Sequence, residues 1–167
     1  MSVSAEELRL TMRTWATGVT VVGVRFNHIL HGMTVSSFTS LSLEPPLVLV
    51  SLEIGTRTHQ FVEKTGTFGV SILAAHQEEV SNCFANPSTD LGDRFSGREV
   101  FYLETGAPFV TGGLAFFDCR VVSVYPAGNH VVYVAEVVAT QINPVFEAVQ
   151  EPLLYFNRNY RTLKELD

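Results

Sequence analysis

The sequence predicts a mainly β fold, a closed or nearly closed β-barrel with a few helices around it. At least six stretches rich in β-branched and aromatic residues follow one another through short connections, which is typical of an antiparallel barrel. A closed sheet also leaves few exposed edges. The order of elements lacks the strand-helix-strand alternation of a parallel sheet. No internal repeat or linker is visible, so we expect one domain over residues 1–167.

Composition and charge narrow the classes of function. Apolar residues make up 46% of the chain and charged residues 17%, and the formal net charge is −6. This balance argues against disorder, and the lack of a Lys/Arg cluster argues against nucleic-acid binding. A ligand with one or two phosphates is still compatible with it. A low charged fraction in a small chain also indicates apolar surface that another subunit covers, so we expect a homodimer.

The sequence contains no recognisable address, anchor or metal motif. Its first residues are acidic, unlike a signal peptide, and its longest uncharged runs hold too many Ser, Thr and Gly to span a bilayer. We therefore expect a cytoplasmic protein without membrane contact. Cys83 and Cys119 lie far apart without a neighbouring His pair, so no metal site is predicted. Both cysteines are expected to be small buried hydrophobic residues.

A helix is predicted at the N-terminal end of the chain. Ser4 and Glu7 have the spacing of a capping box, and apolar residues from Leu8 to Trp15 follow helical spacing. Gly18 is a suitable residue to end such a helix. We therefore expect an amphipathic helix that extends to Gly18 and buries one face.

The rest of the chain is interpreted mainly as strands. A hairpin is expected from residues 19–26 and 29–33, joined at Asn27-His28, and a strand buried on both faces from residues 47–52. The composition of loop 86–94 offers few apolar side chains to bury, so this loop is the best candidate for a mobile segment. The remaining predicted elements are strands 67–73, 114–125 and 131–141 and helices 57–64 and 75–85.

The stretch from Gly32 to Ser42 is unusual for a strand. It places six hydroxyl groups within nine residues, where a strand that only builds a core would alternate with apolar residues. One interpretation is a polar ligand lying against the stretch. The other is an exposed edge or a turn whose hydroxyls bond their own backbone. Composition alone leaves both interpretations open.

Thr56-Arg57-Thr58 is a candidate anion site. These residues follow the predicted strand 47–52 and open a predicted helix, so two hydroxyls, a guanidinium and free backbone N–H groups would meet there. The alternative is a plain helix N-cap with a solvated arginine. N-caps are far commoner than phosphate sites, so the residues by themselves favour the cap.

The order of these pieces resembles the short-chain flavin reductases, which supply reduced flavin to monooxygenases. The resemblance rests on a small-residue entry at Gly32, Thr-Val-Ser-Ser-Phe at 34–38, Ser40-Leu41, Pro45-Pro46 and the strand that follows. It implies an FMN-binding split β-barrel of Greek-key type with peripheral helices. It also implies reduction of FMN or FAD by NADH or NADPH, with a monooxygenase as a possible partner. The absence of Gly-x-Gly-x-x-Gly agrees with a nicotinamide site outside a doubly wound domain.

The resemblance also suggests which residues hold the flavin. Residues 34–37 would contact the ring and ribityl chain, and residues 51–53 would pass beneath the ring. Thr39 and Ser40 would lie close to the phosphate, which residues 56–58 would bind. The loop around Arg94 would cap the flavin, and Arg158 could hold a pyrophosphate or a carboxamide. The full set implied for binding is Met33, Thr34, Val35, Ser36, Ser37, Thr39, Ser40, Ser51, Leu52, Glu53, Thr56, Arg57, Thr58, Arg94, Phe95, Tyr155 and Arg158.

His130 is the residue that the resemblance associates with the nicotinamide side of the flavin. It ends the sequence Gly128-Asn129-His130, where family members usually carry Gly-Asp-His. Asn129 keeps a hydrogen-bonding side chain but removes a charge. Without the family, a Gly-Asn turn with a surface histidine explains the same residues.

Two other classes of protein share parts of this pattern. One is a stable flavin-binding split barrel, either an electron carrier or a protein like pyridoxamine-phosphate oxidase. The other is a haem-binding barrel with a lone histidine as axial ligand. The hydroxyl-rich stretch together with the Gly-x-His hairpin favours the reductase over both. No nucleophile elbow is present, which agrees with chemistry that the cofactor supplies.

Overall fold

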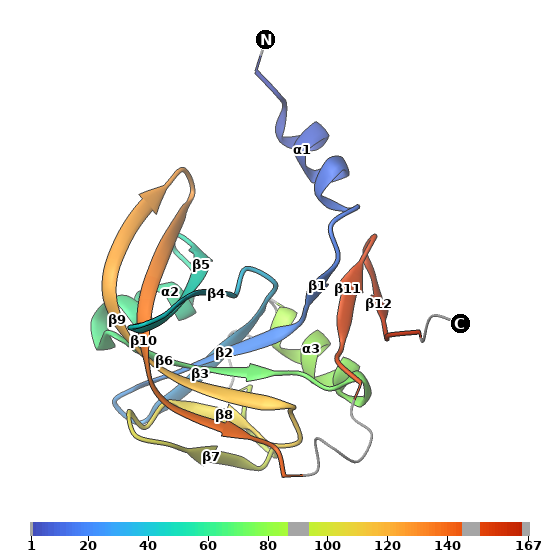
Figure 1. The fold of residues 1–167 in the computed structure, drawn as a ribbon. Helices are drawn as coiled ribbons and strands as arrows, with labels where there is room; N and C mark the ends of the chain where they lie inside the picture. The colour runs from blue at the N-terminus through green and yellow to red at the C-terminus, as the bar shows by residue number, and fades with distance from the viewer. Residues whose placement is uncertain (1, 87–93, 145–150, 165–167) are drawn as a thin grey trace.

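The computed structural model describes residues 2–86, 94–144 and 151–164 (Figure 1). Over these residues the chain is mainly β, as predicted, with helices at the periphery. None of the helices in these ranges has the length and apolar character that crossing a bilayer requires. The helices are α1 (Ala5–Met12), α2 (Arg57–Thr65), the short 3₁₀ helix η1 (Ala75–Gln77) and α3 (Glu78–Ala85).

The main sheet has seven strands, and every neighbouring pair is antiparallel. Two smaller sheets accompany it, of order β1-β11-β12 and β7-β8. In sheet order, the seven strands are β3 (Ile29–Val35), β2 (Thr20–Phe26), β6 (Thr67–Ile72), β9 (Ala115–Ala127), β10 (His130–Ile142), β5 (Pro46–Glu53) and β4 (Thr39–Leu43). The strands of the smaller sheets are β1 (Thr17–Gly18), β11 (Leu154–Phe156), β12 (Asn159–Arg161), β7 (Val100–Tyr102) and β8 (Pro108–Val110).

The main sheet curls back on itself. Strand β3 forms one edge and β5 lies next to the other, yet Ser37, just after β3, hydrogen bonds to the backbone of Ser51 in β5. The strand ladder stays open between β3 and β4 in the described residues. The predicted split β-barrel is therefore confirmed in the form of a curled sheet with one open seam.

Two clusters of buried side chains lie on the two sides of strand β2. Val22 and Val24 point into the larger cluster with Phe68, and helix α2 covers that cluster through Val62. Val21 points the other way, into the cluster that α3 covers through Phe84. The alternation follows from the two-residue period of a strand. Strand β2 is thus buried on both faces, and it fixes where β3 and the hydroxyl-rich stretch after it lie.

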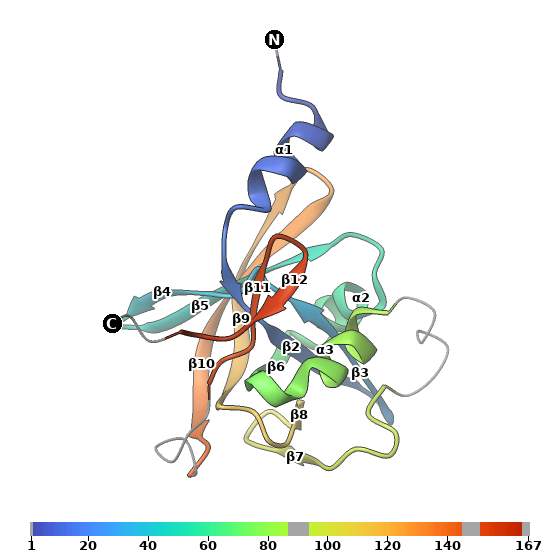
Figure 2. The same ribbon diagram turned by 90° about the vertical axis from the view of Figure 1, so that its right-hand side faces the viewer.

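The predicted N-terminal helix is confirmed at its start, where Ser4 and Glu7 form the expected capping box, but its predicted extent to Gly18 and its predicted buried face were wrong. Helix α1 ends at Met12, all of its side chains are exposed, and Trp15 beyond it is 66% exposed. Thr17 and Gly18 instead pair with Tyr155 and Leu154 of β11. This pairing requires extended backbone, so it overrides the helical spacing of the apolar residues. Figures 1 and 2 show α1 standing away from the main sheet, to which β1 connects it.

Most other predicted elements are confirmed. The hairpin turn lies at Asn27-His28, with Asn27 in the left-handed region at a φ of 56°. Strand 47–52 is correct in extent but wrong in burial, because Val48, Val50 and Leu52 are buried while the opposite face is only half-buried. The predicted helix 75–85 divides into η1 and α3. The predicted mobile loop 86–94 lies outside the described residues except for its two ends.

Candidate functional site

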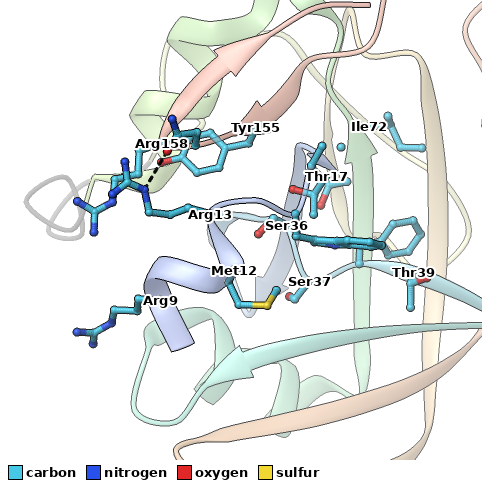
Figure 3. A pocket seen from close by; sticks show the side chains of 16 residues that line it. Arg9, Met12, Arg13, Thr17, Ser36, Ser37, Thr39, Ile72, Tyr155 and Arg158 are labelled. Atoms are coloured by element: carbon cyan, nitrogen blue, oxygen red, sulfur yellow. Dashed lines mark hydrogen bonds between the residues drawn. The ribbon is translucent and has the colours of Figure 1, made fainter. Parts of the chain in front are cut away.

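A cavity of about 840 Å³ opens where the N-terminal segment, the hydroxyl-rich stretch and the β11–β12 hairpin meet (Figure 3). Its size is in the range of sites for small ligands and cofactors. Arginines lie at one end of the cavity in Figure 3, and hydroxyl-bearing residues lie at the other. The lining residues are Arg9, Met12, Arg13, Trp15, Ala16, Thr17, Gly18, Thr20, Ser36, Ser37, Phe38, Thr39, Ile72, Tyr155, Asn157 and Arg158.

The hydroxyl-rich stretch divides its hydroxyls between structure and solvent. Thr34 Oγ1 donates to the carbonyl of Ser81 at 2.7 Å, and Ser37 Oγ is bonded to the backbone of Ser51. Ser36 is exposed, and its hydroxyl has no hydrogen bond to any described residue. Thr39 makes only a 3.4 Å contact with the carbonyl of Ser40. Ser36 and Thr39 are therefore the hydroxyls that face the cavity with capacity to bind a ligand.

The start of this stretch is fixed by close packing. A Cβ at Gly32 would lie 2.8 Å from the carbonyl oxygen of Val22 and 3.1 Å from the ring of Phe84, so only glycine fits. Arg94 is 7% exposed, and its Nη1 donates to the carbonyls of Gly32 and Phe84, both at 2.7 Å. Nη2 donates to the carbonyl of Asn86 at 2.8 Å. Strand β3 is thereby held against α3, which positions the hydroxyls that follow.

A smaller cavity of about 160 Å³ adjoins the first and shares Ser36 and Tyr155 with it. Its wall includes Tyr160, whose hydroxyl bonds to Ser81 Oγ at 2.8 Å and to Asn82 Oδ1 at 3.0 Å. These bonds hold the β11–β12 hairpin against α3. The same hairpin therefore walls both cavities.

Strand β5 connects the cavity to the β9–β10 hairpin. Ser51 contacts Ser37, and two residues further along β5 Glu53 pairs with His130. Two residues of a strand span roughly 7 Å. The ring of His130 is half-buried, and its Nδ1 lies 2.9 Å from Oδ1 of Asn129. His130 therefore lies along the strand from the cavity rather than in its wall.

Helix α2 begins beside this hairpin. Thr56 Oγ1 accepts from the N–H of His59 at 3.3 Å and donates to the carbonyl of Glu53 at 2.8 Å, so Thr56 is an N-cap in this structure. The guanidinium of Arg57 lies 5.3 Å from the centre of the Phe61 ring, a cation–π distance. Thr58 is fully buried, and its hydroxyl has no hydrogen-bond partner among the described residues.

Comparison with known proteins decides the family. The model of the flavin reductase like domain matches residues 12–164. The chain belongs to this family. An NADH-dependent flavin reductase of a Rhodococcus species is 35% identical over 98% of this chain and 89% of that protein. The reductase component of 4-hydroxyphenylacetate 3-monooxygenase from Thermus thermophilus is 36% identical over 95% of this chain and 96% of that protein.

Solved structures of flavin reductases have the same fold. The NADH:FAD oxidoreductase SgcE6 of Streptomyces globisporus, in complex with NAD and FAD fragments, superposes with a TM-score of 0.87. The two chains are 33% identical, and the match covers 98% of this chain and 97% of that one. The predicted family resemblance is therefore confirmed.

The structure of this flavin reductase family member brings part of the predicted site together. Ser36, Ser37, Thr39, Tyr155 and Arg158 line the larger cavity, and Thr34, Val35, Ser36 and Tyr155 line the smaller one. The other predicted residues lie outside both cavities; they are Met33, Ser40, Ser51, Leu52, Glu53, Thr56, Arg57, Thr58, Arg94, Phe95 and His130.

The larger cavity matches the chemistry of a flavin ring. Such a ring has an apolar benzenoid end and a polar pyrimidine edge, so it needs hydroxyls or N–H groups beside flat apolar surface. Ser36 and Thr39 provide the hydroxyls, and Met12, Trp15 and Phe38 provide apolar surface. No group of three His, Cys, Asp or Glu residues suited to a metal ion is present in the described ranges.

Sequence reasoning missed the residues that α1 and its C-terminal end contribute. Met12 and Trp15 were assigned to a buried helix face, and Arg9 and Arg13 were not considered. Their one signal in the sequence is a pair of arginines four residues apart, the spacing that puts two side chains on one side of a helix. That signal alone does not distinguish a binding site from a solvated face.

Proposed function

We propose that this protein is a flavin reductase that transfers a hydride from NADH or NADPH to FMN or FAD. The observation that carries the proposal is the 840 Å³ cavity built on the hydroxyl-rich stretch in a member of the flavin reductase like family. Relatives named as NADH-dependent reductases support NADH as the preferred donor. One of these relatives is named as an FAD reductase and another as an FMN reductase, so the proposal includes both flavins as acceptors.

The residues present can be given roles towards a flavin. Ser36 and Thr39 would hydrogen bond the polar edge of the ring, and Met12 and Trp15 would cover its apolar part. Thr34, Ser37 and Arg94 act indirectly, because their polar groups hold the backbone of the hydroxyl-rich stretch in place. A bound flavin supplies the hydride-accepting chemistry, so no side-chain nucleophile is needed.

The region around α2 would hold the flavin phosphate. Arg57 and the N-terminus of this nine-residue helix offer positive charge and backbone dipoles. His130 lies beside Glu53 at the end of β5, between the cavity and the start of α2. It would contact the nicotinamide of the donor, with Asn129 orienting its ring through the Nδ1 contact. In this role His130 positions the donor for hydride transfer.

We also propose that the protein is a homodimer. Helix α1 presents Leu8 and Leu10 at exposures of 56% and 51%, and the β9–β10 hairpin presents Val122 and Val124 at 51% each. Both elements project from the main sheet in Figures 1 and 2. A second copy that covered this apolar surface would explain why α1 buries nothing within its own chain. A mass corresponding to one chain in light scattering would contradict this proposal.

Partner, location and domain organisation complete the proposal. A monooxygenase would receive the reduced flavin, since several relatives are named as reductase components of monooxygenases. Cys83 and Cys119 are free thiols, which supports a cytoplasmic location. Residues 1–167 would act as one flavin reductase-like domain.

One steady-state experiment tests the activity. NADH and NADPH are each combined with FMN and with FAD, and oxidation of the nicotinamide is followed by absorbance. We expect oxidation well above the uncatalysed rate for at least one pair. A yellow protein that oxidises neither nucleotide would instead be a stable flavin carrier or an oxidase-like protein. A red protein would be a haem protein.

A further inference from the structure

We propose that Arg9, Arg13 and Arg158 form a subsite for the diphosphate of a dinucleotide. The inference deepens the proposed function, on which it rests, because it assigns one end of the cavity to a specific part of the substrate. It concerns a different place from the start of α2, whose residues do not line the cavity. The ligand chemistry is the diphosphate of the nicotinamide dinucleotides, because the phosphate of the flavin is assigned to the start of α2.

The three arginines lie at the same end of the cavity, although they come from the two ends of the chain. Arg9 lies in the last turn of α1. Arg13, four residues after Arg9, is the C-cap of that helix. Arg158 lies at the tip of the β11–β12 hairpin. In Figure 3 Arg13 and Arg158 lie at one edge of the view with Arg9 below them, and all three are away from Ser37, Thr39 and Ile72.

Backbone geometry and hydrogen bonds hold this end in place. Asn157 and Arg158 have φ angles of 49° and 62°, the paired left-handed residues of a tight hairpin turn. Arg13 Nε donates to Asn157 Oδ1 at 3.0 Å, and the N–H of Asn157 donates to the carbonyl of Arg13 at 3.0 Å. These two bonds fasten the hairpin tip to the end of α1. They leave both Nη groups of Arg13 without a hydrogen bond to any described residue.

Arg9, Arg13 and Arg158 form no ion pair with any described residue. Neither Arg9 nor Arg158 forms a side-chain hydrogen bond to those residues. Glu7, an acidic residue of α1, turns away from them, because its carboxylate accepts from the N–H of Ser4 at 2.8 Å and from the Ser4 hydroxyl at 2.7 Å. In a chain of net charge −6, three guanidiniums at one cavity end are an arrangement that an anion would stabilise.

The shape of the cavity indicates which anion fits. Each guanidinium group can donate two parallel hydrogen bonds to phosphate oxygens. Several guanidinium groups therefore suit a diphosphate better than a single phosphate. From this end the cavity runs past Met12 and Thr17 to Ser37 and Thr39 (Figure 3). A ligand that fills it would therefore carry a diphosphate at one end and a flat ring with polar edges at the other. A dinucleotide has this structure.

The test compares Arg9→Gln/Arg158→Gln with wild type and with Arg161→Gln. Arg13 is left intact because it fastens the hairpin tip. Arg161 is the matched control, since it is exposed on the same hairpin and does not line the cavity. The first measurement is calorimetric binding of ADP-ribose, which carries the diphosphate without a reactive ring. The second is steady-state kinetics with NADH or a dihydronicotinamide that lacks phosphate, each combined with FAD or riboflavin.

We expect the double variant to bind ADP-ribose at least about tenfold more weakly than wild type, as loss of charge-assisted bonds predicts. Its KM should rise for NADH, the donor that carries the diphosphate. Its rate with the phosphate-free donor and riboflavin should match wild type. Arg161→Gln should stay within about twofold of wild type in every assay, since an exposed charge outside the site contributes little.

Unchanged ADP-ribose affinity in the double variant would overturn the inference, as would a wild type that does not bind ADP-ribose. An equal loss with the phosphate-free pair would also overturn it, because it would indicate a general structural defect. Failure of the proposed function gives a different result. In that case wild type would oxidise no nicotinamide with any flavin, while the binding comparison would still test the arginines.

Discussion

Ser37 and Ser51 exchange two hydrogen bonds across the open seam of the barrel. The Ser37 hydroxyl donates to the carbonyl of Ser51 at 2.7 Å and accepts from its N–H at 3.3 Å. One side chain thus replaces part of the strand ladder that is missing between β3 and β4. The neighbouring Ser36 hydroxyl has no such role, so adjacent serines of the same stretch serve structure and ligand separately.

The first prediction follows from this difference. Ser37→Ala should lower the free energy of unfolding by about 1 to 3 kcal/mol, since each lost hydrogen bond costs roughly 0.5 to 1.5 kcal/mol. Ser36→Ala is the matched control; it should leave stability unchanged and weaken flavin binding. Urea denaturation and a flavin titration measure the two quantities. Equal stability of the two variants would contradict the structural role of Ser37.

The second prediction concerns the phosphate at the start of α2. Arg57→Gln should weaken FMN binding by about 1.5 to 3 kcal/mol, the range for a hydrogen bond to a charged group, and leave riboflavin binding unchanged. Lys64→Gln is the control, because Lys64 lies on the same helix and packs 5.0 Å from the Phe26 ring much as Arg57 packs on Phe61. Unchanged FMN affinity in Arg57→Gln would show that the flavin phosphate does not bind at the start of α2.

The third prediction separates positioning of the donor from flavin binding. His130→Ala should lower turnover with NADH, because a misplaced nicotinamide loses the geometry that hydride transfer needs. Flavin affinity should change much less. His28→Ala, an exposed histidine in the β2–β3 turn, is the control for both measurements. The opposite pattern, with flavin affinity lost and turnover kept, would give His130 a different role.

The fourth prediction concerns stability at high pH. Burial raises the pKa of Tyr133 above its ordinary value, and the carboxylate of Glu63 raises it further. The folded protein therefore keeps this proton to higher pH than the unfolded chain, whose tyrosines titrate near pH 10. Stability should be unaffected below about pH 10 and fall as the pH rises further, because the unfolded state then binds fewer protons. Tyr133→Phe should lessen this fall in denaturation curves measured between neutral and alkaline pH. A slope equal to that of wild type would contradict the assignment.

Sequence reasoning succeeded where the signal is local. The β2–β3 hairpin, the extent of β5 and the start of α2 all follow from residue composition and turn residues within short windows. Ser36, Ser37 and Thr39 of the hydroxyl-rich stretch line a cavity, although composition alone left an exposed edge equally open. The family resemblance then supplied the flavin.

The errors occurred where residues far apart in the sequence meet. The helical spacing that ends at Trp15 was overridden by the pairing of Thr17 with Tyr155. The guanidinium of Arg94, which the family resemblance places against the flavin, donates to the backbone carbonyls of Gly32, Phe84 and Asn86, which only the folded chain brings together. The arginine end of the cavity exists only because the hairpin tip is fastened to α1. No short window of sequence contains such information.

The hydrogen bonds between Arg13 and Asn157 bear on the order in which the protein folds during translation. Residues 155–158 emerge from the ribosome after every strand of the main sheet, while Arg13 is among the first residues to appear. A nascent chain can therefore assemble its barrel before the cavity has its final wall, since domains begin to fold as they are synthesised. The cavity therefore gains its last wall only once residues 155–158 have been synthesised.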